Sequence, residues 1–501
     1  MPSRKALLLP ALVPVLFHVL LLLVSKADPP FLVQLLSYLS TTAFIRNLPS
    51  LVNPPDLPAS FAVLPFSPSS SSKNAPVQFT VHSSEPTRPR SERLAYCEDA
   101  IPLTVGEGDA KKNLVLVSCD PNRKSWNTVM GPLRHPYGAQ GALWIVDSSP
   151  EGGKEPEAKR VEMDWPALEA KRVQFHPLGI EVVESSREGD EQLLLAINHG
   201  AKESTIELFS LSSSSLTAKH LHTIELHPNP PSAPNSLAVL PSSTRTRLRF
   251  FLSHDHRFNK RSPALLRKLA NTAETILSLP LAQVSYVEVT LEKRGYKIVE
   301  KPAITGIPFA NGLALSSNGE TLVVASTTRK ELLFYSVPSL PSASSLPSSP
   351  FSPLTLTRKV SLPFLVDNLS VLPSNNAEDE KETFTVLAAG HPSYPALLSV
   401  AHSLRLSTSS LPSLVQRFLL PKAFTFDHEE QRGMSWAVSV IHPAKEGSGK
   451  EWETVFQSNG RVQERGFGGS TTAIGGRGED GKGWMVVAGL YEEGVKVVRE
   501  R

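Results

Sequence analysis

Cysteine and aromatic residues are scarce in this chain. Only two cysteines, Cys97 and Cys119, occur among 501 residues, and aromatic side chains make up 7% of the total. A reducing compartment would explain so few cysteines, although the N-terminus, described below, indicates the opposite. The His and Cys residues at short spacing that a zinc site requires are also missing.

Charge of one sign is equally lacking. The formal net charge is +3, and Lys and Arg are scattered rather than gathered in a stripe with interleaved aromatic residues. This pattern predicts no nucleic-acid partner. Hydrophobic residues at 40% and charged residues at 20% are ordinary for a globular protein.

A long apolar run near the N-terminus predicts a membrane segment. Arg4 and Lys5 precede the run 6–24, and about 20 apolar residues cross a bilayer. The basic flank favours a cytoplasmic N-terminus, so we expect residues 1–27 to be a signal anchor, with the rest of the chain lumenal or extracellular. Small residues after the run also fit a signal-peptide cleavage site, and cleavage would make the protein secreted.

The next segment, 28–91, is expected to connect this anchor to the folded domain. Its apolar stretch 31–45 is too short to span a membrane and fits an amphipathic interfacial helix. Residues 66–77 are rich in Ser and Pro and resemble a flexible linker. We therefore assign residues 92–501 to the folded domain.

Short apolar runs separated by Gly, Pro, Asn and Ser fill this domain and predict an all-β fold. One helix is expected at 263–279. Sixteen or more strands without βαβ alternation favour a β-propeller over a single sandwich. The expected strands are 114–117, 142–146, 192–197, 205–211, 236–240, 249–252, 284–290, 313–315, 322–325, 332–337, 369–372, 385–389, 396–400, 436–441, 454–457 and 484–488.

Acid and amide residues recur just before these apolar runs. Taken singly, each is most simply a turn residue or a strand cap. Repeated at the inner starts of successive strands, they would converge on the central channel of a propeller and offer the oxygen ligands that Ca²⁺ prefers. The residues are Glu98, Asp99, Asn235, Asp255, Asn311, Asp367 and Asn368.

From about residue 92 to residue 492 the chain is similar to the serum paraoxonase/arylesterase family. The resemblance implies a six-bladed β-propeller with two central calcium ions that hydrolyses esters or lactones. An N-terminal hydrophobic segment is also typical of this family. The matching motifs are C-E-D (97–99), F-H-P-L-G-I-E (175–181), L-L-A-I-N-H-G (194–200), L-S-H-D-H-R-F (252–258), F-A-N-G-L-A-L-S-S-N-G (309–319), L-V-D-N-L-S-V (365–371) and G-H-P (390–392).

The resemblance also implies roles for individual residues. The second, structural calcium would use Asp99 and the backbone carbonyl of Ile180, but Ser236 stands where a further carboxylate is expected. The inner calcium would polarise the carbonyl of an ester or lactone substrate. Its implied ligands are Glu98, Asn235, Asn311, Asp367 and Asn368.

One part of the family pattern is incomplete. The family carries a pair of histidines proposed to activate water, and His199 matches the second of them. Leu178 stands where the first is expected, with His176 two residues earlier. His199 is therefore the predicted catalytic residue. His256 and His391 match family histidines near the ion, where orienting a ligand or packing is their expected role.

The cysteines also differ from the family, whose disulfide joins the N-terminal region to the last strand. No cysteine follows Cys119, so we expect Cys97 and Cys119 to pair locally in the oxidising secretory pathway.

Three functions fit these observations. The first is a membrane-anchored, calcium-dependent hydrolase of esters or lactones. The second is a calcium-binding propeller without catalytic activity, acting as an interaction module in the secretory pathway. The third is a related propeller chemistry such as sugar-lactone hydrolysis. Fold resemblance alone does not choose among them.

Overall fold

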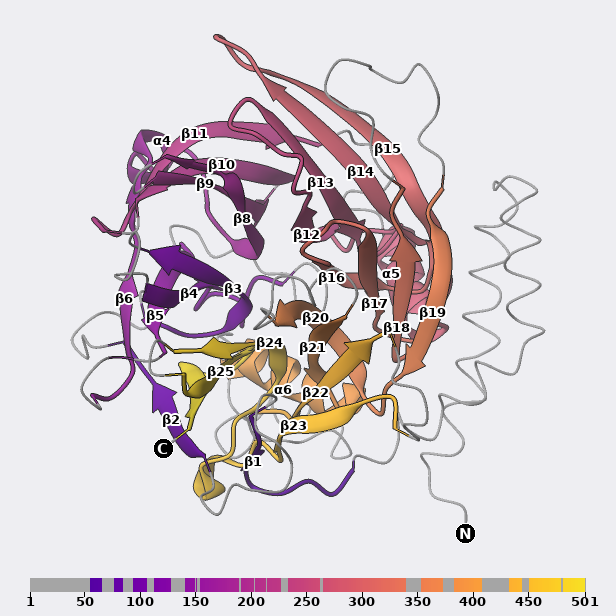
Figure 1. Cartoon of the computed structure of the whole chain (residues 1–501). Coiled ribbons are helices and arrows are strands. Elements are labelled where there is room, and N and C mark those ends of the chain that lie inside the picture. Colours follow the sequence, from indigo (N-terminus) through magenta and orange to yellow (C-terminus); the bar gives the residue numbers. More distant parts are fainter. Residues whose placement is uncertain are drawn as a thin grey trace.

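Six sheets arranged in a ring make up the described part of the computed structural model (Figure 1). Each inner strand contacts the inner strand of the next sheet, and the sixth contacts the first, which closes the ring. The fold is a six-bladed β-propeller, as predicted. The inner strands are β3 (Cys97–Val105), β8 (Pro177–Glu188), β12 (Pro234–Val239), β16 (Ala310–Leu315), β20 (Leu365–Leu372) and β24 (Ser470–Arg477).

Within each blade the strands follow one another outward, and neighbours are antiparallel except for β7 beside β11. The first blade adds β4 (Lys112–Cys119), β5 (Ala142–Asp147) and β6 (Glu157–Arg160). The second blade adds β9 (Glu191–His199), β10 (Ser204–Ser212), β11 (Thr217–Glu225) and β7 (Glu162–Asp164). The third blade adds β13 (Arg247–His254), β14 (Ala282–Leu291) and β15 (Tyr296–Ile307). The fourth blade adds β17 (Thr321–Ser326), β18 (Glu331–Ser336) and β19 (Thr355–Ser361). The fifth blade adds β21 (Phe384–His391), β22 (Ser435–His442) and β23 (Glu453–Ser458). The sixth blade adds β25 (Gly483–Gly489) and β26 (Val495–Arg499).

Two short strands from the N-terminal side complete the last two blades. The strand β1 (Phe61–Ala62) pairs with β23, and β2 (Val77–Val81) pairs with β26. Both lie within the segment 28–91, which the sequence pattern assigns to the region before the folded domain. The β2 pairing joins a strand from before residue 92 to the final strand of the chain, so the sheets extend upstream of that expected boundary.

The structure describes residues 55–64, 76–83, 93–105, 112–127, 140–148, 150, 154–188, 191–201, 203–212, 214–226, 233–261, 265–338, 353–372, 383–407, 432–443, 450–478 and 481–500. The expected signal anchor and the interfacial stretch 31–45 lie outside these ranges. Within them, no helix combines the length and the apolar character needed to cross a bilayer.

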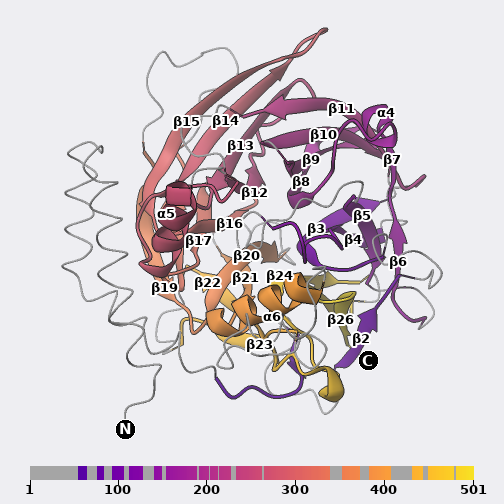
Figure 2. The ribbon, with the colours of Figure 1, turned by 180° about the vertical axis from the view of Figure 1, so that it is seen from behind.

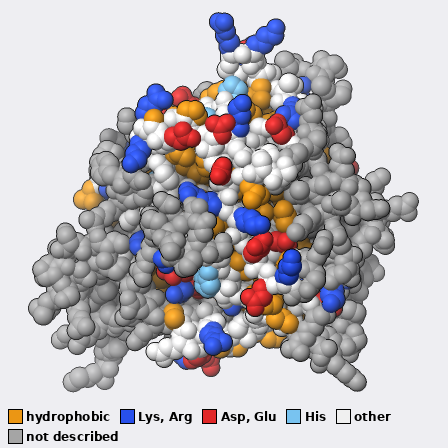
Figure 3. All heavy atoms as spheres, turned by 90° about the vertical axis from the view of Figure 1, so that its left-hand side faces the viewer, with side chains coloured by type: hydrophobic (Ala, Val, Ile, Leu, Met, Phe, Trp, Pro, Cys, Tyr) orange, Lys and Arg blue, Asp and Glu red, His pale blue; other side chains and the backbone are white. Residues whose placement is uncertain are grey.

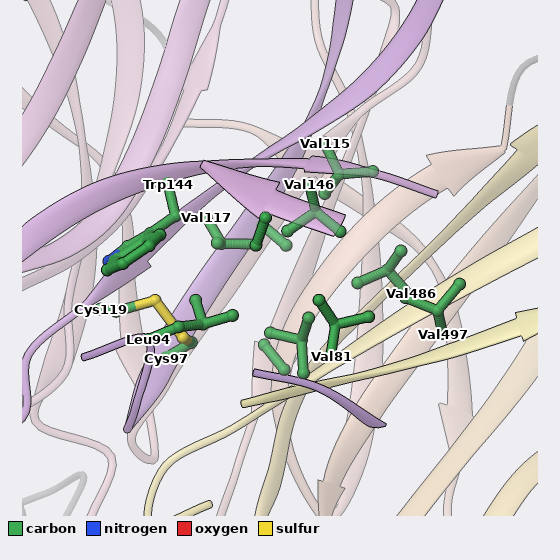
Figure 4. Packing of buried hydrophobic residues seen from close by; sticks show 14 of the residues in the cluster. Val81, Leu94, Cys97, Val115, Val117, Cys119, Trp144, Val146, Val486 and Val497 are labelled. Carbon is green, nitrogen blue, oxygen red and sulfur yellow. A yellow bond between two sulfur atoms is a disulfide. The ribbon is translucent and has the colours of Figure 1, made fainter. Parts of the chain in front are cut away.

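The core between the first and last blades contains the disulfide (Figure 4). Cys97 and Cys119 are register partners on β3 and β4, and their sulfurs are 2.06 Å apart, so the expected local pairing is confirmed. Buried aliphatic side chains from both blades, such as Val117 and Val486, pack around them. Full burial of one such side chain stabilises the fold by about 1.5–3 kcal/mol.

Two helices lie on the face turned toward the viewer in Figure 2. The expected helix at 263–279 is observed as α5 (Leu265–Ile276). The expected strand at 396–400 is wrong, because α6 (Tyr394–Ser407) occupies this segment. Its buried residues Leu397, Val400, Ala401 and Leu404 follow helical spacing and pack against Tyr96 and Tyr491.

Two shorter helical segments complete the description. They are α4 (Pro166–Glu169) and the 3₁₀ turn Val462–Glu464. On the side of the molecule seen in Figure 3, Lys and Arg side chains are interspersed with Asp and Glu over the described surface. This mixture accords with the small net charge of the chain.

We expect Gly312→Ala to push two blades apart. A Cβ at this position would lie 2.5 Å from both the Cα of Asn368 and the backbone carbonyl oxygen of Asp367. Backbone atoms cannot rotate away, so the free energy of unfolding should fall by about 1–3 kcal/mol in chemical denaturation. Gly200→Ala is the matched control, because the nearest atom there is the Glu203 carbonyl oxygen at 3.0 Å. Equal losses in both variants would contradict the close approach of the blades.

Candidate metal centre

Each of the six inner strands contains a β-bulge, where its pairing with the second strand of the blade changes register. A bulge bends its strand and re-aims the residues within it. All five predicted ligands of the inner calcium lie in these bulges. The bulge residues are Glu98 in β3, Leu178 and Gly179 in β8, Asn235 and Ser236 in β12, Asn311 and Gly312 in β16, Asp367 and Asn368 in β20, and Thr471 in β24.

Side chains from distant parts of the sequence meet at this ring. The Nδ2 of Asn368 donates to Oε1 of Glu98 at 3.0 Å and to its backbone carbonyl at 3.1 Å, although 270 positions separate the two residues. The Nδ2 of Asn311 donates to Oδ1 of Asp367 at 2.6 Å. Asp367 and Asn368 are neighbours in the chain, so the structure brings four of the five predicted ligands together.

The fifth, Asn235, occupies the bulge of the adjacent blade. Its neighbour Ser236 accepts a hydrogen bond from the backbone N–H of Leu313 at 3.1 Å, which fastens the β12 bulge to β16. A Cβ on Gly179 would lie 2.4 Å from the Asn235 carbonyl oxygen, so β8 also approaches closely. All five residues are buried, with exposed fractions between 2% and 7%.

Four oxygens of this set have no hydrogen-bond partner in the structure. They are Oε2 of Glu98 and the Oδ1 atoms of Asn235, Asn311 and Asn368. A buried oxygen without a partner costs about 1–3 kcal/mol, so four at one place require an explanation. Calcium binds six to eight oxygens from carboxylates, amide carbonyls, backbone and water. The donor set therefore fits Ca²⁺, and the charges of Glu98 and Asp367 would balance it.

In each of three blades, a second side chain contacts a predicted ligand. It lies at or directly after the end of the second strand. Thr327 Oγ1 accepts from Asn311 Nδ2 at 3.1 Å, and His391 Nε2 lies 2.9 Å from Asp367 Oδ2. Asp255 Oδ2 is 3.5 Å from Asn235 Nδ2. Such contacts fix the orientation of metal ligands.

The carboxyl groups at the centre are unfavourable without a cation. Burial, then the charges of Asp99 and Asp367, raise the pKa of Glu98 well above its ordinary value. Burial also raises the pKa of Asp99 to about 7, against opposing hydrogen bonds from Ile180 and Ala100. Like charges in a buried site favour the protonated form, whereas a bound cation favours the carboxylate.

The predicted second calcium site is arranged differently. Asp99 accepts hydrogen bonds from the backbone N–H groups of Ile180 and Ala100, both at 2.9 Å, and lies 3.4 Å from Thr472 Oγ1. Ile180 thus meets Asp99 through its N–H, whereas the sequence predicted its carbonyl as a ligand. The Ser236 hydroxyl is engaged by Leu313. A second ion at these residues stays a prediction.

The predicted histidines are buried and contact neighbouring residues. Nε2 of His199 donates to the Pro234 carbonyl at 2.7 Å. Burial, then the nearby Arg261, lower the pKa of His199 to about 3, so it is a weak proton acceptor. Leu178 is buried in an apolar cluster. His256 contacts Asp255 at 3.0 Å and stacks edge-on against Phe309.

Asp120 and Thr327 were missed in the sequence, because the predicted apolar runs 114–117 and 322–325 end before the observed strands β4 and β17, which each of these residues directly follows. Only the pairing of the inner strands reveals that this position lies behind the bulge. Among the described residues, no three His, Cys, Asp or Glu side chains are placed to hold a metal together. The candidate centre depends instead on asparagine oxygens.

We expect Asn311→Ala to lower calcium affinity about tenfold or more, since one ligand oxygen and the hydrogen bond to Asp367 are lost together (tenfold corresponds to about 1.4 kcal/mol). Isothermal titration calorimetry on the full-length protein measures this change. Asn318→Ala, in the exposed hairpin of the same blade, is the control and should leave the affinity unchanged. Equal affinities in all three proteins would remove Asn311 from the site.

The stability of the metal-free protein should fall as pH rises from about 5 to 8. The folded state has raised pKa values at Glu98 and Asp99 and so binds more protons than the unfolded state in this range. Its stabilisation is present at low pH and is lost as pH rises through the folded pKa values. Saturating calcium should remove this fall in thermal unfolding curves. A metal-free protein that gains stability over the same range would contradict the raised values.

Comparison with known proteins gives one family match. A family model described as Arylesterase matches residues 138–411. No sequence among the curated proteins is a significant match for this chain.

Three solved structures are similar to this chain at low identity. An alpha-L-arabinanase of Penicillium chrysogenum is 12% identical, with 85% of this chain and 98% of that chain covered and a TM-score of 0.41. A luciferin-regenerating enzyme is 11% identical (80% and 96% covered, TM-score 0.33). The hydrazine synthase of Kuenenia stuttgartiensis is 12% identical, and the match covers 55% of this chain and 64% of that chain (TM-score 0.30). Likeness at this level carries no information about activity.

The family match, in contrast, covers more than half of the chain and includes four of the five predicted ligands of the inner calcium. This protein belongs to the arylesterase family.

Proposed function

We propose that this protein is a calcium-dependent hydrolase of carboxylic esters or lactones. Membership of the arylesterase family indicates a hydrolase. The observation that supports the metal is the group of four buried oxygens without partners, gathered beside two carboxyl groups. Substrate identity within this class is left open, and sugar lactones belong to the range to be tested.

In this proposal the inner bulges hold the ion through Glu98, Asn235, Asn311, Asp367 and Asn368. When bound, calcium would polarise the substrate carbonyl and stabilise negative charge on its oxygen. The chain's part is to fix the ligands before substrate arrives. Thr327 and His391 would do this, because they hold Asn311 and Asp367 in place.

The cellular setting is part of the proposal. A buried disulfide persists in oxidising compartments, which supports the secretory pathway. The signal anchor at residues 1–27 and the amphipathic segment and Ser/Pro linker expected within 28–91 stay predictions. If both hold, the propeller faces the lumen or the exterior and meets small ester or lactone substrates near a membrane.

One observation favours the non-catalytic alternative. Leu178 replaces a histidine of the family pattern, and the low pKa of His199 makes it a weak base. A calcium-stabilised propeller that binds a partner in the secretory pathway would need neither group.

Hydrolysis of a panel of aryl esters, alkyl esters and lactones by the full-length protein tests the two functions. We expect turnover with calcium that is abolished by chelator, and a loss of at least about 100-fold in Glu98→Ala. Glu464→Ala, an exposed carboxylate in the 3₁₀ turn, is the control and should keep full activity. Calcium binding without turnover of any substrate would favour the interaction module.

A further inference from the structure

A buried histidine–carboxylate pair lies where the first and second blades meet. Nδ1 of His176 is 2.8 Å from Oδ2 of Asp120, and both side chains are 2% exposed. The backbone N–H of His176 donates to Oδ1 of Asn198 at 2.9 Å. An ionised carboxylate only accepts hydrogen bonds, so this contact places the ring proton of a neutral His176 on Nδ1.

The symmetry of the propeller places Asp120 at a strand position that supports a predicted ligand in other blades. Asp120 follows β4 as Asp255 follows β13 and Thr327 follows β17. Those two residues contact the bulge asparagines of their own blades. Asp120 instead contacts His176, which precedes the bulge residue Leu178 by two positions.

Arg123 connects the pair to the centre. Its Nη2 donates to the Pro177 carbonyl at 2.9 Å and its Nε to the Tyr96 carbonyl at 3.2 Å. Pro177 follows His176, and Tyr96 precedes Glu98 by two residues. The charge of Arg123 acts on both Asp120 and Glu98. One guanidinium thus spans the start of the β8 strand and the start of β3.

We propose that His176, held by Asp120, is the general base of the hydrolase. This assignment rests on the proposed function. Bound through Nδ1, the imidazole presents Nε2 as its proton acceptor, and it lies beside the bulge in which Leu178 supplies no titratable group. Asp120 acts as the positioning residue, since it fixes the tautomer and stabilises the protonated ring.

The environment distinguishes His176 from His199. Burial opposes ionisation of Asp120, but the neighbouring His176 and Arg123 hold the pKa of Asp120 below its ordinary value, so the carboxylate is charged. His199 uses Nε2 to bind Pro234, and its backbone N–H donates to the His176 carbonyl at 3.0 Å. His199 therefore supports the backbone of His176.

Charged and titratable groups lie near His176 on several of the described elements. Asp120 and Arg123 face it from the segment after β4, and His199 ends the adjacent strand β9. Glu207 on β10 reaches it indirectly, through Asn198. The ring of Trp126 lies 5.9 Å away and contributes no charge.

The proposed step conserves atoms and charge. Nε2 of His176 takes a proton from water as the water oxygen bonds to the carbonyl carbon, and the carbonyl π pair moves onto its oxygen. When that pair reforms the double bond, the bond from carbon to the leaving alcohol oxygen breaks. The proton on Nε2 passes to the departing oxygen, which gives the acid and the alcohol and restores the neutral imidazole.

The test compares His176→Asn with His222→Asn in full-length, calcium-loaded protein. Asparagine keeps a donor toward Asp120, and His222 lies on the outermost antiparallel strand of the second blade. We expect His176→Asn to lower kcat for an aryl acetate and a δ-lactone about 10²–10⁴-fold. KM, calcium affinity and thermal unfolding should stay close to those of the wild type. The acid limb of the pH–rate profile should also disappear.

Asp120→Asn separates positioning from structure. Nitrogen NMR of ¹⁵N-histidine-labelled protein should show His176 with its proton on Nδ1 in the wild type and a mixed or reversed tautomer in the variant. A wild-type proton on Nε2 would overturn the proposal without any activity measurement.

The remaining outcomes are distinguishable. An active wild type with His176→Asn within about threefold of its rate overturns the assignment of the base and leaves the hydrolase intact. A wild type without chelator-sensitive turnover overturns the hydrolase, and the role of His176 with it. His176 would have a structural role only if two results were obtained together. His176→Asn would lose folding or calcium binding, and NMR of the wild type would show the ring proton of His176 on Nε2.

Discussion

The burial of several oxygen-bearing side chains at one point is the constraint on which this structure depends. Carboxylates and amides of four blades converge where water is excluded, and the like charges of Glu98 and Asp367 raise the free energy of the metal-free centre. The amide nitrogens have hydrogen-bond partners in the protein, whereas four of the oxygens do not. A divalent cation would relieve both problems together, and its binding would then stabilise the fold.

The β-bulges make this convergence possible. A regular inner strand would alternate its side chains between the two neighbouring blades, and none would face the axis. The bulge interrupts that alternation at the same level in each blade, so one or two residues leave the ladder. Gly179 and Gly312 allow adjacent backbones to approach closely at this level. Polar residues in the bulges and small residues beside them are thus parts of one arrangement.

The residues proposed for proton transfer occupy equivalent positions in the blades, but they contact different partners. In three blades a residue at or directly after the end of the second strand supports a bulge side chain of its own blade. In the first blade Asp120 turns to the neighbouring His176, and in the second His199 turns to the backbone of the third blade. The bulge of the second blade also differs, because it contains the apolar Leu178. The first two blades therefore differ from the third, fourth and fifth blades in the same way.

The sequence by itself determined the all-β class and the propeller. It also indicated the five residues that lie in the inner bulges, because these residues stand just before short apolar stretches of the sequence. It also determined the local pairing of the cysteines, since no other partner exists. Tertiary structure decided that residues 394–407 are helical. A short apolar run is compatible with a strand or with a helix, and here the packing on Tyr96 and Tyr491 favours the helix. It also decided that Asp120 contacts His176, 56 positions away, because only the meeting of two blades brings these residues together.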